Sequence, residues 1–319
     1  MKNRIKIISL SANEKMANDI AKLLDAKLIE RDLIHFADGE IMFEGKETFR
    51  GDNVYIIQST CTPVNERLME VLICADACKR GSAKSVTCIM PYYGYSRQDR
   101  KAKPRQPITA KLVADLLTTA GVDKMVCVDL HAAQIQGFFN IPLDNTTAMY
   151  LFYPYLKHLN LENPVCVSPD HGGVVRTSKL AKKLNCPIAI IDKRRPEPNK
   201  AEILAIVGDV KDKTCIIVDD IVDTAGTLCA AANKLKELGA KAVYATITHG
   251  ILSGSAIDKI NDSAIEKLII TDSIPLREGI DARKIEVLSL APILSRTINA
   301  LEEGLSLGDT YKNYEEESI

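Results

Sequence analysis

The chain has 319 residues, of which 46% are hydrophobic, enough to form the cores of two domains of ordinary size. Its 41 basic residues nearly balance 42 acidic ones, so a net charge of -1 provides no overall field for binding nucleic acid or an anionic membrane. No segment is apolar over the length of a membrane span, and the nine cysteines form no C-x-x-C pair, so we expect a cytoplasmic protein with reduced core thiols.

The first half of the chain alternates short apolar runs with amphipathic helical patterns, which is typical of parallel α/β folds. Strands are predicted at residues 6–10, 54–59, 86–90 and 125–131, and helices near residues 17–24, 64–79 and 110–117. After the first helix, residues 36–40 (FADGE) form a turn signal with two acids and an aromatic residue. Taken alone, this segment is interpreted as a solvated hairpin turn.

A loop rich in tyrosine and cations follows the strand predicted at residues 86–90. Three tyrosines lie between positions 92 and 95, and the segment from Arg97 to Arg105 holds five basic residues and one acid. One interpretation is a mobile surface loop. The favoured one is a lip over a polyphosphate, because arginine makes bidentate contacts to phosphate oxygens.

Two predicted strand ends carry residues suited to a divalent cation. Asp129 and His131 are two apart at the end of a predicted strand, so we expect their side chains on one face, where they could share a cation. The alternative for His131 is an ordinary hydrogen-bonded side chain. In the second half, the strand predicted at 165–168 is followed by Asp170 and by the glycine pair 172–173, which forms a phosphate-sized turn.

The second half repeats the alternation of strands and helices, so we predict two similar doubly wound parallel-sheet domains, at residues 1–147 and 148–319. The second domain is expected to include a closing helix at residues 291–301 and a polar tail. Residues 192–200 hold two prolines and four cations, which predicts an absence of regular structure. This segment is interpreted either as a solvated linker or as a lid whose cations reach transferring phosphates.

The most informative stretch runs from Thr214 to Thr227 (TCIIVDDIVDTAGT). Its apolar run is predicted to be a strand buried on both faces that stops at Asp219 and Asp220, at the edge where α/β sheets bind ligands. The small residues that follow lead into a helix, and their backbone N–H groups suit an anion. The acids would repel a bare phosphate, so they are expected to face sugar hydroxyls or a divalent cation, which predicts a sugar phosphate ligand. The alternative is an ordinary strand-to-helix turn with a capping aspartate.

Together these motifs resemble those of the ribose-phosphate diphosphokinase family, within the superfamily that has the type I phosphoribosyltransferase fold. The stretch from Thr214 to Thr227 looks like the phosphoribosyl-diphosphate binding loop of that superfamily. The resemblance covers nearly the whole chain in the same motif order. It implies that the first domain contributes ATP contacts and that the second binds ribose 5-phosphate.

The resemblance also implies a role for each candidate site residue. The ATP contacts would come from Phe36, Asp38, Gly39, Glu40, Arg97 and Gln98. The ribose 5-phosphate contacts would come from Asp219, Asp220, Asp223, Thr224, Ala225, Gly226 and Thr227. The Mg2+ ligands would be His131 and Asp170, with Asp129 as a further candidate, and the catalytic residues would be Lys193 and Arg195.

The reaction that the resemblance implies is transfer of the diphosphoryl group of Mg-ATP to the C1 hydroxyl of ribose 5-phosphate, giving 5-phosphoribosyl 1-diphosphate and AMP for nucleotide biosynthesis. A homohexamer with no nucleic-acid or membrane partner is expected. One alternative is a phosphoribosyltransferase that consumes the diphosphate, but it leaves the FADGE and SRQDR segments unexplained. Another is a non-catalytic regulatory relative, which is disfavoured because Lys193, Arg195, His131 and Asp219 are all present.

Overall fold

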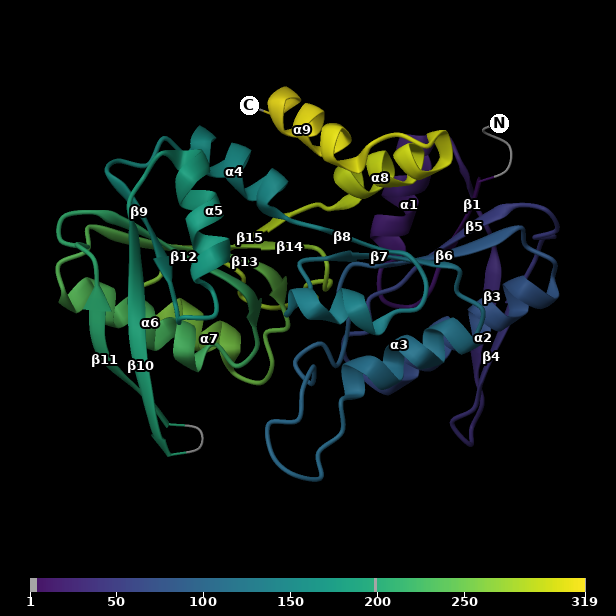
Figure 1. Ribbon diagram of the computed structural model, residues 1–319, viewed down its shortest axis with the longest axis horizontal. Helices are drawn as coiled ribbons and strands as arrows, with labels where there is room; N and C mark the ends of the chain where they lie inside the picture. Colours follow the sequence, from purple (N-terminus) through teal and green to yellow (C-terminus); the bar gives the residue numbers. More distant parts are fainter. Residues whose placement is uncertain (1–4, 198–199, 319) are drawn as a thin grey trace. The chain divides into compact units, whose positions relative to one another are not determined.

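The computed structural model describes residues 5–197 and 200–318, without the side chains of residues 193–204. The chain divides into two compact units, each with its own largely parallel sheet (Figure 1). The first unit contains Met1–Thr147, Ser273–Pro275 and Ser289–Thr310, and the second contains Ala148–Asp272, Leu276–Leu288 and Tyr311–Ile319. Among the residues with described structure, no helix combines the length and the apolar character needed to cross a bilayer.

The first unit is built on a six-stranded sheet in which neighbouring strands are parallel, in the order β2-β1-β5-β6-β7-β8. The strands are β1 (Ile5–Ser9), β2 (Lys27–Leu28), β5 (Asn53–Ile57), β6 (Ser85–Met90), β7 (Lys124–Val128) and β8 (Leu143–Thr146). The helices are α1 (Glu14–Leu24), α2 (Val64–Arg80), α3 (Thr109–Thr119), the 3-10 helix η2 (Ala133–Phe138) and α8 (Ala291–Glu303). Val54 and Ile56 of β5 pack in the core formed with α2 and α3, whereas the hydroxyl of the intervening Tyr55 donates to Glu302 of α8. Helices therefore contact both faces of this sheet.

The second unit has a seven-stranded sheet in the order β11-β10-β9-β12-β13-β14-β15, with an antiparallel pairing between β10 and β11. The strands are β9 (Pro164–Ser168), β10 (Ile188–Glu197), β11 (Lys200–Val207), β12 (Thr214–Val222), β13 (Ala242–Gly250), β14 (Lys267–Thr271) and β15 (Ile285–Leu288). The helices are α4 (Met149–His158), α5 (Val174–Leu184), α6 (Gly226–Glu237), α7 (Ala256–Asp262) and, from Tyr311 onward, α9 (Leu307–Glu317). Cys215 and Ile217 of β12 pack with α6, while Ile216 and Val218 pack with α4 and α5. The apolar run of β12 is thus buried on both faces, as predicted.

Both units have the same strand order. Counted along the chain by their parallel strands, each sheet has the order 2-1-3-4-5-6. Each sheet therefore has one topological switch point, between β1 and β5 in the first unit and between β9 and β12 in the second. Ligands of open α/β sheets bind beside such points, at the carboxyl ends of the strands. The predicted fold class, two similar doubly wound parallel-sheet domains, is confirmed.

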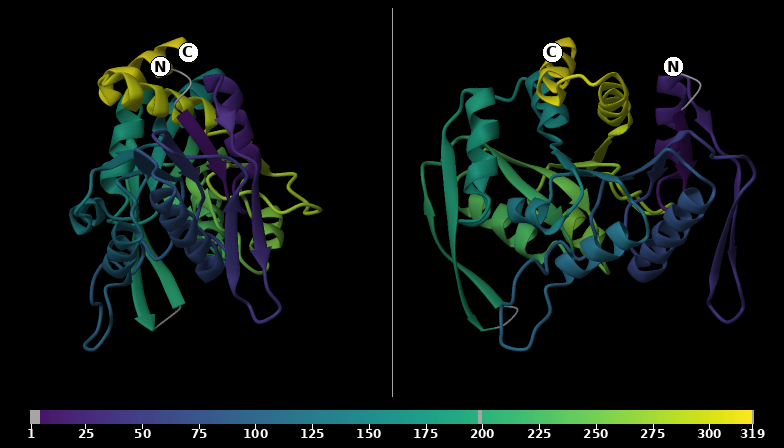
Figure 2. Two further views of the ribbon diagram at one scale, coloured as in Figure 1. Left: turned by 90° about the vertical axis from the view of Figure 1, so that its right-hand side faces the viewer. Right: turned by 45° about the vertical axis from the view of Figure 1, so that its right-hand side comes forward.

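Each unit also carries an antiparallel hairpin after its second parallel strand. In the first unit β3 (Arg31–His35) pairs with β4 (Ile41–Gly45), and in the second β10 continues past its parallel part to pair with β11 (Figure 2). The prediction of irregular structure at residues 192–200 is wrong up to Glu197 and again from Lys200, while residues 198 and 199 lie outside the described residues. Pro196 falls within a pairing irregularity between Arg194 and Glu197, where a residue without an N–H group is tolerated.

The C-terminal part of the chain differs from the predicted domain division in one helix. The closing helix α8 packs against α1 and belongs to the first unit, whereas the prediction assigned it to the second domain. The polar tail, for which no helix was predicted, forms α9. Its Tyr311 is buried, with the ring centroid 5.2 Å from that of Tyr150.

Candidate functional site

The acid pair of the second unit lies inside a strand rather than after its end. Asp219 and Asp220 are part of β12, which continues to Val222. β9 pairs with β12 as far as Ile217, whereas β13 accompanies β12 to its last residue. The expectation that the strand stops at the acids is therefore wrong, because β13 supplies backbone partners beyond the apolar run. The acids still lie beside the switch point, where β9 has already ended.

Arg176, in the first turn of α5, contacts both carboxylates. Its Nη1 donates to Asp219 Oδ1 at 3.2 Å and to Asp220 Oδ1 at 3.0 Å. The Asp220 backbone N–H also donates to Asp219 Oδ1, at 2.9 Å. Asp220 is buried and Asp219 half-buried. Sequence reasoning did not include Arg176, and the available signal was weak: a cation shortly after the glycine pair at 172–173.

The environment of the acid pair changes its titration. Burial, and then the adjacent Asp220 carboxylate, raise the pKa of Asp219 to about 7, while the Arg176 guanidinium opposes this rise. Asp219 therefore titrates near neutral pH. An ionised carboxylate accepts hydrogen bonds from hydroxyl groups, whereas a protonated one can also donate.

The loop from Asp223 to Thr227 forms a compact turn at the start of α6. Ala225 has a left-handed backbone (φ 59°), and α6 begins at Gly226. Thr224, Gly226 and Thr227 are exposed, and a Cβ atom built at Gly226 would meet no other atom within 4 Å. The first N–H groups of a helix have no partner within that helix and lie at the positive end of its dipole. This turn is therefore accessible to an anion such as a phosphate.

A second turn follows β9, the strand on the other side of the switch point. Oδ1 of Asp170 accepts from the Gly173 N–H at 3.0 Å, and the Ser168 hydroxyl donates to the Asp170 carbonyl at 2.7 Å. A Cβ atom at Gly173 would lie 2.9 Å from Ser168 Oγ, so a larger residue there would displace the Ser168 hydroxyl. Because parallel neighbours end at the same edge of a sheet, the second unit brings Asp170, Arg176 and the acid pair to one edge.

In the first unit, Phe36 lies in the turn between β3 and β4. Its N–H donates to the Glu40 carbonyl at 2.9 Å, and the Gly39 N–H donates to the Phe36 carbonyl at 3.0 Å. The Glu40 N–H donates to Asp38 Oδ1 at 3.1 Å, and Gly39 has a φ of 94°, which favours glycine. The hairpin turn predicted for residues 36–40 is confirmed. Phe36 is 46% exposed, so its ring is available for stacking.

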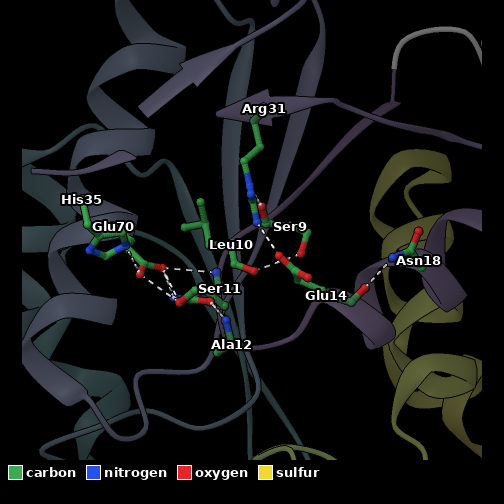
Figure 3. A network of polar contacts seen from close by, with 10 residues as sticks. Ser9, Leu10, Ser11, Ala12, Glu14, Asn18, Arg31, His35 and Glu70 are labelled. Atoms are coloured by element: carbon green, nitrogen blue, oxygen red, sulfur yellow. Dashed lines mark hydrogen bonds and ion pairs between the residues drawn. The ribbon is translucent and has the colours of Figure 1, made fainter. Parts of the chain in front are cut away.

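The buried Glu70 of α2 lies between the turn end of this hairpin and the loop after β1 (Figure 3). Its carboxylate accepts from Ser11 Oγ at 2.8 and 2.7 Å and from Gln58 Nε2 at 2.6 Å. His35 Nε2, next to Phe36 in sequence, lies 3.9 Å from Glu70 Oε1. A buried carboxylate needs such partners, and here the hydrogen bonds anchor the loop after β1 and place the carboxylate close to His35.

The switch point of the first unit is occupied by its own chain. Ser59, just after β5, donates through Oγ to the Ser273 carbonyl at 2.6 Å, and its N–H donates to Asn13 Oδ1 at 2.6 Å. Asn13 Nδ2 also donates to the Ser273 carbonyl, at 3.4 Å. The polar groups at this edge are therefore used within the fold, in contrast to the corresponding edge of the second unit.

Arg97 and Gln98 lie in a turn after β6, and both are exposed. The Gln98 N–H donates to the Tyr95 carbonyl at 2.9 Å, and Gln98 Oε1 accepts from Thr109 Oγ1 at 2.6 Å. Gln98 thus connects this turn to the start of α3. Gly94 brings the turn against Thr60, whose carbonyl oxygen would lie 2.4 Å from a Cβ atom there.

Asp129 and His131 do not lie on a strand. β7 ends at Val128, Asp129 has a φ of 42°, and its N–H donates to the Thr146 carbonyl at 2.9 Å. The alternation argument that placed both side chains on one face is therefore wrong, because the chain turns at Asp129. Asp129 is half-buried and His131 exposed, at the carboxyl end of their sheet.

Lys193 and Arg195, the predicted catalytic residues, lie on β10. The backbone of Lys193 pairs with that of Ile203 on β11. Their side chains are outside the described part of the chain, so the structure gives only the backbone positions of these two residues. That position is a strand of the hairpin, not an irregular lid.

Known proteins resemble the chain over nearly its whole length. Residues 5–121 match the N-terminal domain of ribose phosphate pyrophosphokinase, and residues 173–312 match the phosphoribosyl synthetase-associated domain. A ribose-phosphate pyrophosphokinase of Clostridium perfringens is 53% identical over 312 residues, which cover 97% of this chain and 98% of the relative. That of Bacillus subtilis is 51% identical over 303 residues, covering 95% and 96%. The crystal structure of phosphoribosylpyrophosphate synthetase from Mycobacterium smegmatis has a TM-score of 0.89 and 42% identity, and the match covers 95% of this chain and 100% of that one.

Proposed function

Because the chain belongs to the ribose-phosphate pyrophosphokinase family, we propose that it transfers the diphosphoryl group of ATP to the C1 hydroxyl of ribose 5-phosphate. The products are 5-phosphoribosyl 1-diphosphate and AMP, and the first serves nucleotide biosynthesis. One observation carries the proposal: at the switch point of the second unit, an acid pair is followed by a turn of accessible backbone N–H groups. These two features suit the two ends of a sugar phosphate.

The sugar phosphate binds along β12 and the turn after it. The turn from Thr224 to Thr227 holds the 5-phosphate through backbone N–H groups and the threonine hydroxyls. Asp219 and Asp220 accept hydrogen bonds from the ring hydroxyls. Asp223 and Ala225 shape the turn, since the left-handed residue 225 directs the chain into α6.

ATP binds through exposed residues of the first unit. The ring of Phe36 stacks on adenine, while Asp38, Gly39 and Glu40 provide polar contacts in the same turn. Arg97 contacts phosphate oxygens, and Gln98 orients the turn that carries Arg97. Hydrogen bonds within the chain already use Ser59 at the switch point of this unit. This supports a nucleotide site built from loops rather than at the switch point.

The transfer forms a bond between the C1 oxygen and the β-phosphorus of ATP. The bond from that phosphorus to the oxygen bridging the α- and β-phosphates breaks, AMP leaves with the electron pair, and the hydroxyl proton passes to solvent. Such transfers need positioning and charge neutralisation more than covalent catalysis. Lys193 and Arg195 supply positive charge to the moving diphosphoryl group.

Two of the three predicted metal ligands carry carboxylate oxygens, the donor type that Mg2+ prefers. His131, Asp129 and Asp170 offer imidazole nitrogen and carboxylate oxygen, although no cluster of three or more His, Cys, Asp or Glu residues lies within the described ranges. Mg2+ is usually held by one or two carboxylates together with water and substrate phosphates, so a metal that binds with ATP needs no complete protein cage. When bound, it neutralises phosphate charge.

The family resemblance supports a cytoplasmic homohexamer. Sedimentation velocity of the purified chain tests the assembly, with an expected mass six times the 35.1 kDa of one chain. A monomer or dimer at all concentrations would contradict the hexamer and leave the reaction itself unaffected.

The reaction is tested by incubating the purified chain with ATP, Mg2+ and ribose 5-phosphate. We expect AMP to form in an amount equal to the ribose 5-phosphate consumed, with a diphosphate ester at C1 by phosphorus NMR. Formation of ADP would show transfer of a single phosphoryl group and refute the proposal. Incubation with 5-phosphoribosyl 1-diphosphate and a purine base should release no diphosphate, which separates this reaction from that of a phosphoribosyltransferase.

A further inference from the structure

We propose that Arg176 is a positioning residue for sugar recognition, which holds the carboxylates of Asp219 and Asp220 in the orientation that binds the ring hydroxyls of the sugar phosphate. The inference rests on the proposed function of the acid pair. Its basis is the bridging contact of one guanidinium nitrogen, which lies 3.2 Å from Asp219 Oδ1 and 3.0 Å from Asp220 Oδ1.

A bridge of this kind restricts both carboxylates at once. Asp219 and Asp220 are consecutive residues of β12, so their Cβ atoms point to opposite faces of the sheet. Their Oδ1 atoms nevertheless meet at one nitrogen of Arg176. Binding a pair of vicinal hydroxyl groups requires two acceptors in a defined relative position, and a fixed bridge supplies it before the sugar arrives.

The location of Arg176 is unfavourable for its own helix. It is the third residue of α5, where the positive end of the helix dipole repels a cation, and the first turn contains no acidic residue. Asp219 and Asp220 of β12 provide stabilising partners for this cation. Conversely, the buried Asp220 would be a costly isolated charge without a cation close by.

The cluster is accessible enough to meet a ligand. The Asp219 side chain is 30% exposed and that of Arg176 24% exposed, whereas the Asp220 side chain is 6% exposed. A purely structural ion pair could be closed off completely. Here both carboxylates keep some exposure, with Asp219 the more exposed of the two, beside the turn predicted to take the phosphate. Arg176 also lowers the pKa of Asp219 and so favours the ionised, accepting form.

The test compares Arg176→Gln and Arg176→Lys with Lys179→Gln, which removes a charge from an exposed position of the same helix. We expect Arg176→Gln to raise KM for ribose 5-phosphate at least about tenfold and to change KM for ATP less than about twofold, since the acid pair that Arg176 bridges is assigned to the sugar phosphate. Arg176→Lys, which keeps the charge, should recover part of the loss. Lys179→Gln should match the wild type.

Two outcomes would overturn the inference. An equal rise of both KM values would indicate general disruption, and unchanged KM values would mean that the bridge does not position the acids. If Arg176→Gln does not fold, the same comparison is made with Arg176→Lys, for which a selective rise in KM for ribose 5-phosphate is still expected.

Calorimetric titration with ribose 5-phosphate separates this inference from the proposed reaction. If the wild type binds the sugar phosphate but forms no AMP, the reaction is wrong while the role of Arg176 can still be measured as a change in Kd. An Arg176→Gln variant that binds as tightly as the wild type would reject the role of Arg176 whatever the reaction is.

Discussion

Lys183 of α5 and Glu315 of α9 form an ion pair in which Nζ lies 2.6 Å from each carboxylate oxygen. Glu315 is 7% exposed, and the same Nζ lies 5.6 Å from the ring centroid of Tyr150 and 5.3 Å from that of Tyr153. A cation shared between a carboxylate and aromatic faces ties the last helix to α5.

We expect Glu315→Gln to lower the free energy of unfolding by about 1–2 kcal/mol, because it leaves the partly exposed Lys183 without its charged partner. Urea denaturation measures the loss, and hydrogen exchange should be faster in peptides from α9. Glu316→Gln is the matched control, since Glu316 is the exposed neighbour on the same helix. Equal behaviour of the two variants would mean that the ion pair does not hold α9.

The raised pKa of Asp219 predicts how stability depends on pH. Because the folded-state pKa, about 7, lies above the ordinary value of 3.8, the folded protein binds more protons than the unfolded one between these values. This carboxyl therefore removes stability as the pH rises through that range. We expect Asp219→Asn to become more stable relative to the wild type at pH 8 than at pH 5, by urea denaturation. Asp212→Asn, at an exposed turn, should show no such trend, and a trend of opposite sign for Asp219→Asn would contradict the pKa shift.

The exposed ring of Phe36 predicts a selective effect on nucleotide binding. Phe36→Ala should raise KM for ATP by roughly tenfold, because stacking of one base on an aromatic ring contributes about 1–3 kcal/mol. The thermal unfolding temperature should hardly change, since the ring is 46% exposed. Met42→Ala removes a 39% exposed apolar side chain from β4 of the same hairpin and should leave KM for ATP unchanged. If both variants raise KM equally, the hairpin matters but stacking does not.

The catalytic role that the family resemblance implies for Lys193 predicts a rate effect. Lys193→Ala should reduce kcat roughly 10²–10³-fold, the usual cost of losing one donor to developing charge. Binding of ribose 5-phosphate, measured by calorimetry, should stay within about twofold. Lys211→Ala, at an exposed position outside the hairpin, provides the control. Unchanged kcat would remove Lys193 from the catalytic residues.

Local patterns predicted the fold class because several strands of the two sheets, such as β5, β6, β7 and β9, are short and rich in apolar residues. The run from Cys215 to Val218 illustrates this, since Ile216 and Ile217 enter two different cores, as expected for a strand of a parallel sheet covered on both faces. The turn at residues 36–40 was also predictable from the sequence, because the hairpin turn places residue 39 at a φ of 94°, a conformation that favours glycine. The assignment of residues to the ATP and ribose 5-phosphate sites stays a prediction in both units, although the strands and turns that carry these residues are formed.

Strand ends were less predictable, because they depend on neighbouring strands. β12 extends past its apolar run since β13 continues beside it to Gly250, whereas β7 ends at Val128, before the predicted His131. β10 runs through a basic, proline-containing segment because β11 pairs with it. None of these partners is apparent from the segment itself.

The sequence by itself determined two doubly wound units, the turn chemistry of FADGE and the acid pair followed by small residues, since these depend on neighbours along the chain. Only the tertiary structure decided that Arg176 bridges Asp219 and Asp220, that Glu70 anchors the loop after β1, and that α8 packs in the first unit. These contacts join residues far apart in sequence, and packing alone selects which buried charges meet.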